Sequence, residues 1–291
     1  MSALSRAAVD SVVPDPFPHL VIDDVLPAAL ADELAATFPS RRTFTRWKPY
    51  GSNQKFLRFA PEVLGDDTIT PAWKAYFTSL EQTVLHDCLR MFGAHLRTEF
   101  PDFETRFGRL DALRTTPRSP SGPGPEVFVD SMLLMHTPVA ERTSVERGPH
   151  VKIAQHIILG YLTLRAPGDD SAGGDFVLYA PKPGAALRFH ERQTTDEQHL
   201  DTRRVIPRRH NSMFLFLNSA RSIQSVSARP VTPHPLIAHH FALRVGAPPF
   251  ELLMAPGVRP LVPETHRSVA RTLRVIRENA GRWVRSQGTG T

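Results

Sequence analysis

The chain has 291 residues, a formal net charge of +6 and one cysteine, and 41% of its residues are hydrophobic. These proportions are typical of a globular protein and exclude wholesale disorder. Cys88 cannot form a disulfide within the chain, and 27 prolines exclude a long helical bundle or coiled coil. No apolar run approaches the roughly 18 residues of a membrane span, and the N-terminus lacks the pattern of a secretory signal. We therefore expect a cytoplasmic protein without a membrane span.

The first part of the chain is predicted to be mainly helical. A strand is expected at His19–Ile22, and then a helix beginning near Pro27, where apolar residues recur every four positions. A longer helix is predicted over Ala72–Phe100, with Gly93 and Pro101 as breakpoints, followed by a shorter helix up to about Leu113. Residues 1–114 thus read as a strand and helices that pack on a core.

The middle of the chain changes from helical to strand-like patterns. Thr115–Pro125 holds four prolines and two glycines and is predicted to be a loop. The short apolar runs that follow are predicted strands, namely Glu126–Met135, Ile157–Leu164, Phe176–Tyr179, Ala186–Phe189, Ser212–Leu217 and Ile237–Val245. Helices followed by closely spaced strands favour an α+β protein with an antiparallel sandwich or barrel over residues 126–247.

Residues 248–291 are predicted to form a C-terminal extension that includes a helix over Glu264–Ser286. Six arginines lie between Arg267 and Arg285 on this helix, opposite an apolar side. A terminal helix that packs on the core accounts for this pattern, and contact with a membrane surface or nucleic acid is the alternative. Basic residues elsewhere are scattered, so neither DNA nor RNA is an expected partner. The four segments are predicted to form one structural domain.

Several motifs in the β-region carry a family resemblance. They are Arg147-Gly-Pro-His-Val-Lys152, the Gly-Gly-Asp sequence ending at Asp175, read as a hairpin turn, and Arg221-Ser-Ile-Gln224 with Val226-Ser-Ala-Arg229. Together with PFPHLVIDDVLP near the N-terminus, they resemble the iron(II)/2-oxoglutarate dioxygenases of the prolyl-4-hydroxylase-like group. The resemblance implies a double-stranded β-helix, also called a jelly roll or cupin-like fold, with packing helices.

The same resemblance places a metal site where this chain departs from the family pattern. The family needs His-any-Asp and a distant second His, which leave open positions on iron. Here His150 matches the first ligand, but Lys152 takes the place of the acid and Gln224 that of the second His. A lysine is normally a cation with three donors and no acceptor, so it would repel iron(II). We expect no metal and no cofactor, with iron(II) and 2-oxoglutarate required only by an alternative in which other ligands are used.

Three further residues are candidates for binding an anionic substrate. The family has a basic residue after its second His that pairs with the far carboxylate of 2-oxoglutarate, and the corresponding stretch here begins at His234 and lacks Arg or Lys. Arg229, His240 and Arg244 are the candidates that remain, with His234 beside them. None is a secure counterpart of the family residue.

Other histidines offer an alternative metal site, and Lys152 offers alternative chemistry. The chain has 13 histidines, including His136, His156, His190 and His239, which are more often satisfied or exposed than metal-bound. Residues two apart on a strand point to one side, so Lys152 is expected to lie beside His150. Its cation can hold a carboxylate or polarise a carbonyl, and its amine can take up a proton or form an imine. Pairing with a carboxylate such as Asp175 would leave it without chemistry.

The sequence therefore predicts a divergent member of the dioxygenase fold without the usual iron triad. The preferred function is a small-molecule biosynthetic enzyme with metal-independent chemistry centred on His150, Lys152 and Gln224. The alternatives are a 2-oxoglutarate-dependent hydroxylase with non-standard ligands and an inactive binding or scaffold homologue. A homo-oligomer is compatible with all three.

Overall fold

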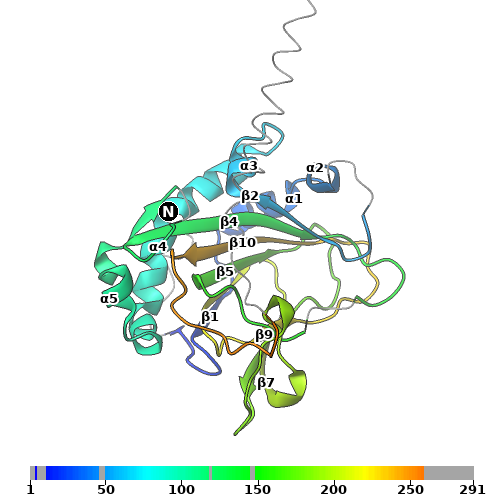
Figure 1. Ribbon diagram of the computed structural model, residues 1–291. Coiled ribbons are helices and arrows are strands. Elements are labelled where there is room, and N and C mark those ends of the chain that lie inside the picture. Colours follow the sequence, from blue (N-terminus) through cyan, green and yellow to red (C-terminus); the bar gives the residue numbers. More distant parts are fainter. Residues whose placement is uncertain (1–3, 5–10, 46–49, 118–119, 145–147, 259–291) are drawn as a thin grey trace, which may run out of the picture. The chain divides into compact units, whose positions relative to one another are not determined.

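The computed structural model describes residues 4, 11–45, 50–117, 120–144 and 148–258 (Figure 1). The chain divides into two compact units, residues 1–260 and 261–291. The second unit, and with it the helix predicted over Glu264–Ser286, lies outside the described residues. Within the described residues, no helix is long and apolar enough to cross a membrane.

The helices lie mostly before residue 110, as the sequence predicts. They are α1 (Ala28–Ala36), α2 (Arg41–Thr45), α3 (Ala60–Leu64), α4 (Pro71–Glu99) and α5 (Phe103–Phe107), with 3₁₀ turns at Leu110–Ala112, Glu191–Gln193 and Glu197–His199. Helix α4 begins with a proline at its first position and ends before Pro101. The predicted break at Gly93 is wrong, because α4 continues through it. A Cβ at this position would lie 3.3 Å from the Leu110 side chain, so the glycine allows a close approach of the following segment.

Seven strands form the larger sheet. They are β1 (His19–Ile22), β2 (Lys55–Phe59), β3 (Arg114–Thr116), β4 (Glu126–His136), β5 (His156–Leu164), β8 (Ser212–Leu217) and β10 (Leu236–Arg244). Their order is β1-β8-β5-β10-β4-β2, and all of these neighbours are antiparallel, while β3 runs parallel to the start of β4. Figure 1 shows β4, β10 and β5 side by side at the centre of this sheet.

The smaller sheet contains β6 (Phe176–Pro181), β7 (Leu200–Ile206) and β9 (Gln224–Val226) in the order β7-β6-β9. His150 extends it by one residue, because its backbone N–H and C=O bond to those of Gln224, both at 3.0 Å. The prediction that residues 150–152 lie on a regular strand is therefore wrong. They lie in an extended segment that bridges Gln224 on one side and Thr194 on the other.

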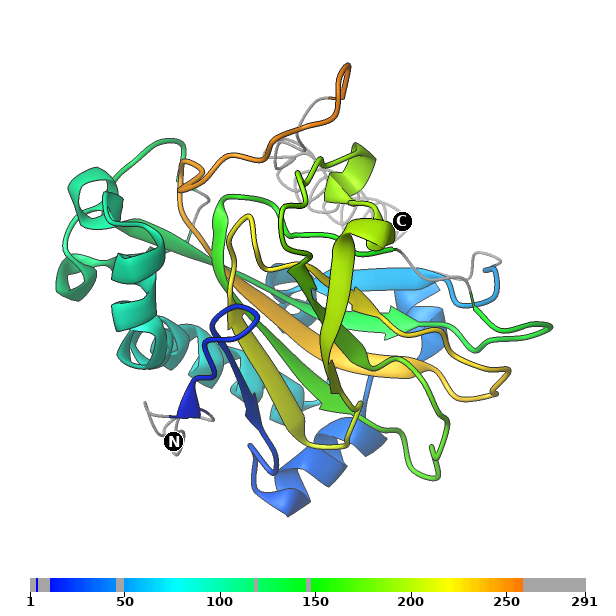
Figure 2. The same cartoon turned by 90° about the horizontal axis from the view of Figure 1, so that it is seen from below.

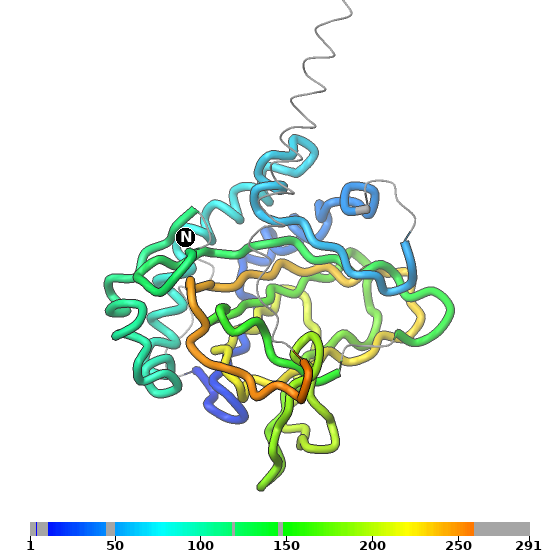
Figure 3. The backbone as a smooth tube through the Cα atoms, viewed as in Figure 1, coloured from blue at the N-terminus to red at the C-terminus, as the bar shows by residue number. Residues whose placement is uncertain are grey.

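The order of these strands is that of a double-stranded β-helix. From β4 onward the chain passes to the His150 segment in the smaller sheet, to β5 in the larger, to β6 and β7 in the smaller, and then alternates through β8, β9 and β10. Figure 3 follows this path along the backbone. The core is thus formed by two facing sheets, and the strand β1 and the strand β2 widen the larger one at its two edges.

The two faces of the larger sheet have different neighbours. One face packs against the helices, and Figure 2 shows α4 running across it. Leu133, Leu215 and Phe241 belong to that helix-facing core, together with Trp73 and Phe77 of α4. The other face meets the smaller sheet, where Leu159, Tyr161, Phe214 and Phe216 pack with Leu178 and Ile206. Side chains of successive residues in these strands therefore pack into separate cores, one against the helices and one between the two sheets.

Three local predictions are corrected by the structure. Ala186–Phe189 forms no strand, only a single bridge between Phe189 and Met254. Residues 115 and 116 of the predicted loop belong to the short strand β3. Gly173 and Gly174, expected in a hairpin turn, lie in the loop that carries the chain from β5 to β6 in the other sheet. Both have positive φ angles, 76° and 79°, which explains why glycine occupies them.

Candidate functional site

The three residues predicted to form the catalytic centre lie together in the structure. Lys152 Nζ is 3.1 Å from His150 Nε2, and Gln224 Nε2 is 3.3 Å from the same imidazole nitrogen. His150 is 4% exposed and Gln224 is fully buried. The backbone pairing between His150 and Gln224 brings two segments that are 74 residues apart into contact and fixes both side chains against Lys152.

The hydrogen bonds of His150 determine which of its nitrogens carries a proton. Nδ1 lies 3.0 Å from the carbonyl oxygen of Gly148, which can only accept, so Nδ1 is the donor. Nε2 of the neutral ring then presents a single lone pair, which the Lys152 ammonium at 3.1 Å and the Gln224 amide at 3.3 Å share. Gln224 therefore turns its Nε2 toward His150, and its Oε1 is left buried without a donor among the described residues. A buried acceptor of this kind marks a place for a water or a ligand.

Aromatic residues from the larger sheet continue this polar group. Lys152 Nζ lies 5.6 Å from the ring centre of Tyr161 on β5, and Tyr161 stacks on His240 of β10 with 4.2 Å between ring centres. His240 Nδ1 lies 3.1 Å from the carbonyl oxygen of Gly160. Burial lowers the pKa of His240 well below its ordinary value, and the positive charge of Lys152 lowers it further. His240 is thus a neutral ring next to the site.

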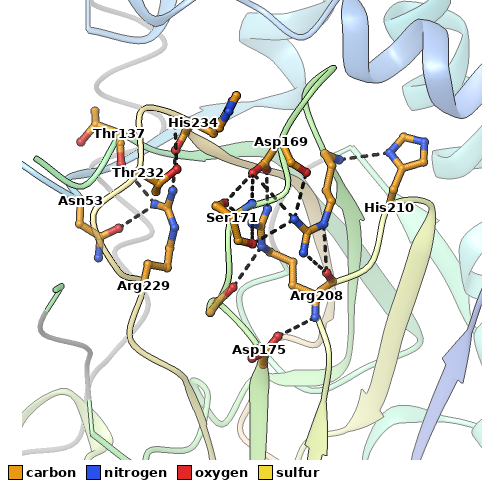
Figure 4. A network of polar contacts seen from close by, with 12 residues as sticks. Asn53, Thr137, Asp169, Ser171, Asp175, Arg208, His210, Arg229, Thr232 and His234 are labelled. Carbon is orange, nitrogen blue, oxygen red and sulfur yellow. Dashed lines mark hydrogen bonds and ion pairs between the residues drawn. The ribbon is translucent and has the colours of Figure 1, made fainter.

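Arg229, predicted to bind an anion, holds loops together. Its guanidinium donates to Asn53 Oδ1 at 3.0 Å, to the carbonyl oxygen of Thr137 at 3.3 Å and to that of His234 at 2.6 Å (Figure 4). It is 1% exposed. All three acceptors are uncharged and are reached by the two terminal nitrogens, and binding of an anion by Arg229 stays a prediction. His234 takes part through its backbone.

Asp175, the carboxylate considered as a partner of Lys152, has other contacts. It accepts hydrogen bonds from the backbone N–H of Arg208 at 2.8 Å and from the Ser227 hydroxyl at 3.2 Å. The Arg208 side chain in turn forms a buried ion pair of 3.0 Å with Asp169 (Figure 4). These contacts connect the β5–β6 loop to the loop between β7 and β8, and Asp175 takes part in this connection.

A second polar group, which the sequence analysis did not identify, surrounds Arg244. Arg244 on β10 is 9% exposed, and its Nε is buried without a hydrogen-bond partner among the described residues. Asp130 on β4 and His156 on β5 flank it, with 3.8 Å between His156 Nε2 and Asp130 Oδ2. Burial raises the pKa of Asp130 to about 6 and lowers that of His156 to about 3. The lower pKa of His156 also reflects the positive charges of Arg244 and Lys152, so the two polar groups adjoin.

The sequence contained only part of the signal for this second group. Arg244 is a candidate because it shares strand parity with His240, and the structure places both on β10. Asp130 and His156 come near it only through the pairing of β10 with β4 and β5, and this register cannot be read from the spacing of the residues. The sequence did contain one indication, since Asp130 interrupts the apolar run of β4 with an acidic side chain.

Two further histidines, His239 and His136, have other surroundings. His239 points to the helix side, where Nδ1 lies 3.1 Å from the Tyr76 hydroxyl and Nε2 2.8 Å from the Ser131 hydroxyl. Burial lowers the pKa of His136 to about 4. Cys88 is buried in α4, where burial raises the pKa of its thiol. In the described part of the chain, no three His, Cys, Asp or Glu side chains lie close enough together to hold a metal ion.

The groups at positions 150, 152 and 224 are a poor set of iron ligands. The family pattern supplies two imidazoles and one carboxylate, whereas this set supplies one imidazole, one amine and one amide. A protonated amine has no lone pair to coordinate a metal, and its proton occupies the Nε2 lone pair that an ion would require. These side chains therefore do not fit an iron(II) ion of the family type.

Comparisons with known proteins give structural likeness only. No family model matches the chain, and no curated protein matches it. It is similar to a prolyl-4-hydroxylase from Pseudomonas putida, with 12% identity, 78% of this chain and 92% of the other covered, and a TM-score of 0.41. It is also similar to the non-heme alpha-ketoglutarate-dependent epimerase SnoN from nogalamycin biosynthesis, with 14% identity, coverages of 85% and 89%, and a TM-score of 0.43.

A third similar structure is an oxidoreductase of the 2OG-Fe(II) oxygenase family from Burkholderia pseudomallei. The identity is 14%, the coverages are 78% of this chain and 84% of the other, and the TM-score is 0.37. The strand order described above is that of the double-stranded β-helix, which is the fold that the sequence motifs imply.

Proposed function

We propose that this protein is a small-molecule biosynthetic enzyme of the cytoplasm that works without iron in a double-stranded β-helix. Its catalytic centre consists of Lys152, His150 and Gln224. The observation that carries the proposal is the 3.1 Å contact between Lys152 Nζ and His150 Nε2, because it joins an ammonium to the nitrogen that would hold iron in the family.

The charge at this centre suits an oxygen-bearing substrate. The Lys152 ammonium can hold a carboxylate or stabilise negative charge that develops on a carbonyl oxygen. The neutral His150 can accept a proton at Nε2, since its Nδ1–H is fixed on Gly148. Proton transfer, elimination and cyclisation are the reaction classes that this pair supports.

Metal binding by matched variants tests the proposal. The wild-type protein, purified anaerobically and titrated calorimetrically with iron(II) and with manganese(II), is expected to show no tight site, with or without 2-oxoglutarate. The double variant Lys152→Asp/Gln224→His is expected to gain a site, because it restores a carboxylate and a second imidazole beside His150. Lys182→Asp, which makes the same charge change at an exposed lysine, is the control and should gain nothing. One iron per chain bound tightly by the wild-type protein would refute the proposal.

A further inference from the structure

The chain contains few lysines, so the presence of Lys152 at the candidate site is informative. It has 30 arginines but only five lysines, Lys48, Lys55, Lys74, Lys152 and Lys182. Arginine holds its proton under all ordinary conditions, whereas a lysine amine can lose it and act as a nucleophile. The cation at the catalytic centre is therefore a lysine, which is the one of these two residue types that can act as a nucleophile.

The surroundings of Lys152 provide a route for its proton. His150 presents a neutral Nε2 lone pair to the ammonium at 3.1 Å, and the bond from Nδ1 to Gly148 prevents the ring from taking the other tautomer in this arrangement. A nucleophile within hydrogen-bond reach of a base that a third group orients is the usual arrangement in covalent catalysis. On its other side Lys152 lies over the face of Tyr161, so an aromatic wall flanks the amine.

A second, independent observation points to a ligand at the same place. Gln224 is 0% exposed, and its Oε1 receives no hydrogen bond from any described residue. Gln224 and Lys152 contact the same nitrogen of His150, so this acceptor belongs to the same centre. A ligand with a hydroxyl group would satisfy it, and addition of an amine to a carbonyl creates such a hydroxyl.

The geometry points to Lys152 as a nucleophile that forms an imine with an aldehyde or ketone substrate. The ammonium gives a proton to His150 Nε2, and the free amine adds to the carbonyl carbon. The nitrogen of the adduct gives one of its protons to the carbonyl oxygen, which becomes a hydroxyl that donates to Gln224 Oε1. The protonated His150 then gives its proton to this hydroxyl, which leaves as water, so one carbonyl and one ammonium give one protonated imine and one water. This inference rests on the proposed function and names its substrate class.

Reductive trapping on the full chain tests the inference. The protein is incubated with pyruvate, and separately with methyl pyruvate, in the presence of sodium cyanoborohydride, and the modified lysines are located by peptide mass spectrometry. Lys152 is expected to be labelled at least about ten times faster than Lys74 and Lys182, since a positioned base contributes roughly 10²–10⁴-fold in rate. The ester lacks the negative charge of the acid, so faster labelling of Lys152 by pyruvate than by methyl pyruvate, relative to Lys74 and Lys182, shows that a carboxylate is recognised.

Two variants control for nonspecific labelling. Lys152→Arg keeps the charge and should abolish the label at this position, and His150→Gln should slow labelling of Lys152 toward the rate of Lys74. Labelling of Lys152 no faster than Lys74 and Lys182 with both probes would overturn the inference. That outcome, with no tight iron in the titration above, would still leave the proposed iron-free function standing, so the two failures are distinguishable.

Discussion

At the scale of single residues, Gly160 shows how tightly neighbouring strands of the larger sheet pack against each other. A Cβ built at Gly160 would lie 2.2 Å from Phe241 Cε1 and 2.4 Å from Phe241 Cζ. Phe241 is fully buried, and Gly160 pairs with it across β5 and β10. The glycine is required by this close approach, since its φ angle is not among the positive ones.

Gly160→Ala is therefore expected to destabilise the protein. Overpacking of a well-packed core costs about 1–3 kcal/mol, and the rigid ring of Phe241 leaves little room to adjust. Urea denaturation followed by circular dichroism measures the loss. Gly51→Ala is the control, because only Gln54 Oε1 lies within 4 Å of the added Cβ, at 3.9 Å. Equal stability of the two variants would contradict the packing described for β5.

A buried histidine predicts how stability depends on pH. His239 is 0% exposed, and burial lowers its pKa from 6.5 to about 3. In the unfolded chain, His239 therefore binds a proton below about pH 6.5. In the folded chain, it binds this proton only below about pH 3. Stability should fall as the pH drops through this window, by about 1.4 kcal/mol per pH unit for each such proton. His136 and His156 act in the same direction, and Asp130, whose pKa is raised, opposes them.

His239→Gln is expected to reduce this slope by about one proton between pH 6 and pH 4. Urea midpoints at several pH values give the slope, and the exposed His86→Gln should leave it as in the wild-type protein. An unchanged slope in His239→Gln would show that His239 is not the group that titrates.

At the scale of elements, the strands that are buried along almost their whole length were all identified from the sequence. Strands β5, β8 and β10 are almost entirely buried on both faces, so they appear as continuous apolar runs. Strand β7, with the sequence LDTRRVI, was missed because four of its seven residues are exposed and mostly polar. Strand β9 has only three residues and was not predicted as a strand, although Gln224 was named as part of a family motif. Hydrogen bonding to β6 makes both of them strands, and this pairing leaves little trace in their composition.

A buried ion pair holds the β5–β6 loop in place. Arg208 and Asp169 form an ion pair whose side chains are 1% and 0% exposed, and Ser171 also accepts from Arg208. Asp169→Asn would leave the Arg208 guanidinium buried without its counter-charge, which typically costs about 3–5 kcal/mol. Thermal or urea denaturation measures this loss. Asp23→Asn breaks an exposed pair with Arg209 and should cost no more than about 1 kcal/mol. Similar losses in both variants would mean that the buried pair contributes no more than a surface one.

At the scale of the whole fold, the sequence predicted the fold class and the closeness of three side chains, but not the polar group beside them. The family motifs place His150, Lys152 and Gln224 together, and the structure brings them into contact, although residues 150–152 do not form a regular strand. The group of Asp130, His156 and Arg244 depends on how β4, β5 and β10 pair, and strand pairing is a long-range property. Arg229 was predicted to bind an anion from its charge and motif, and its contacts with Asn53 and His234 could not be read from the sequence.

The alternation along β10 separates two kinds of position. His239 faces the helices and His240 faces the space between the sheets, so adjacent residues contact different parts of the molecule. A substitution on the inner side can change the polar groups between the sheets while the packing against the helices stays in place. This separation makes the inner side of the sheet a place where residues can be exchanged without loss of the fold.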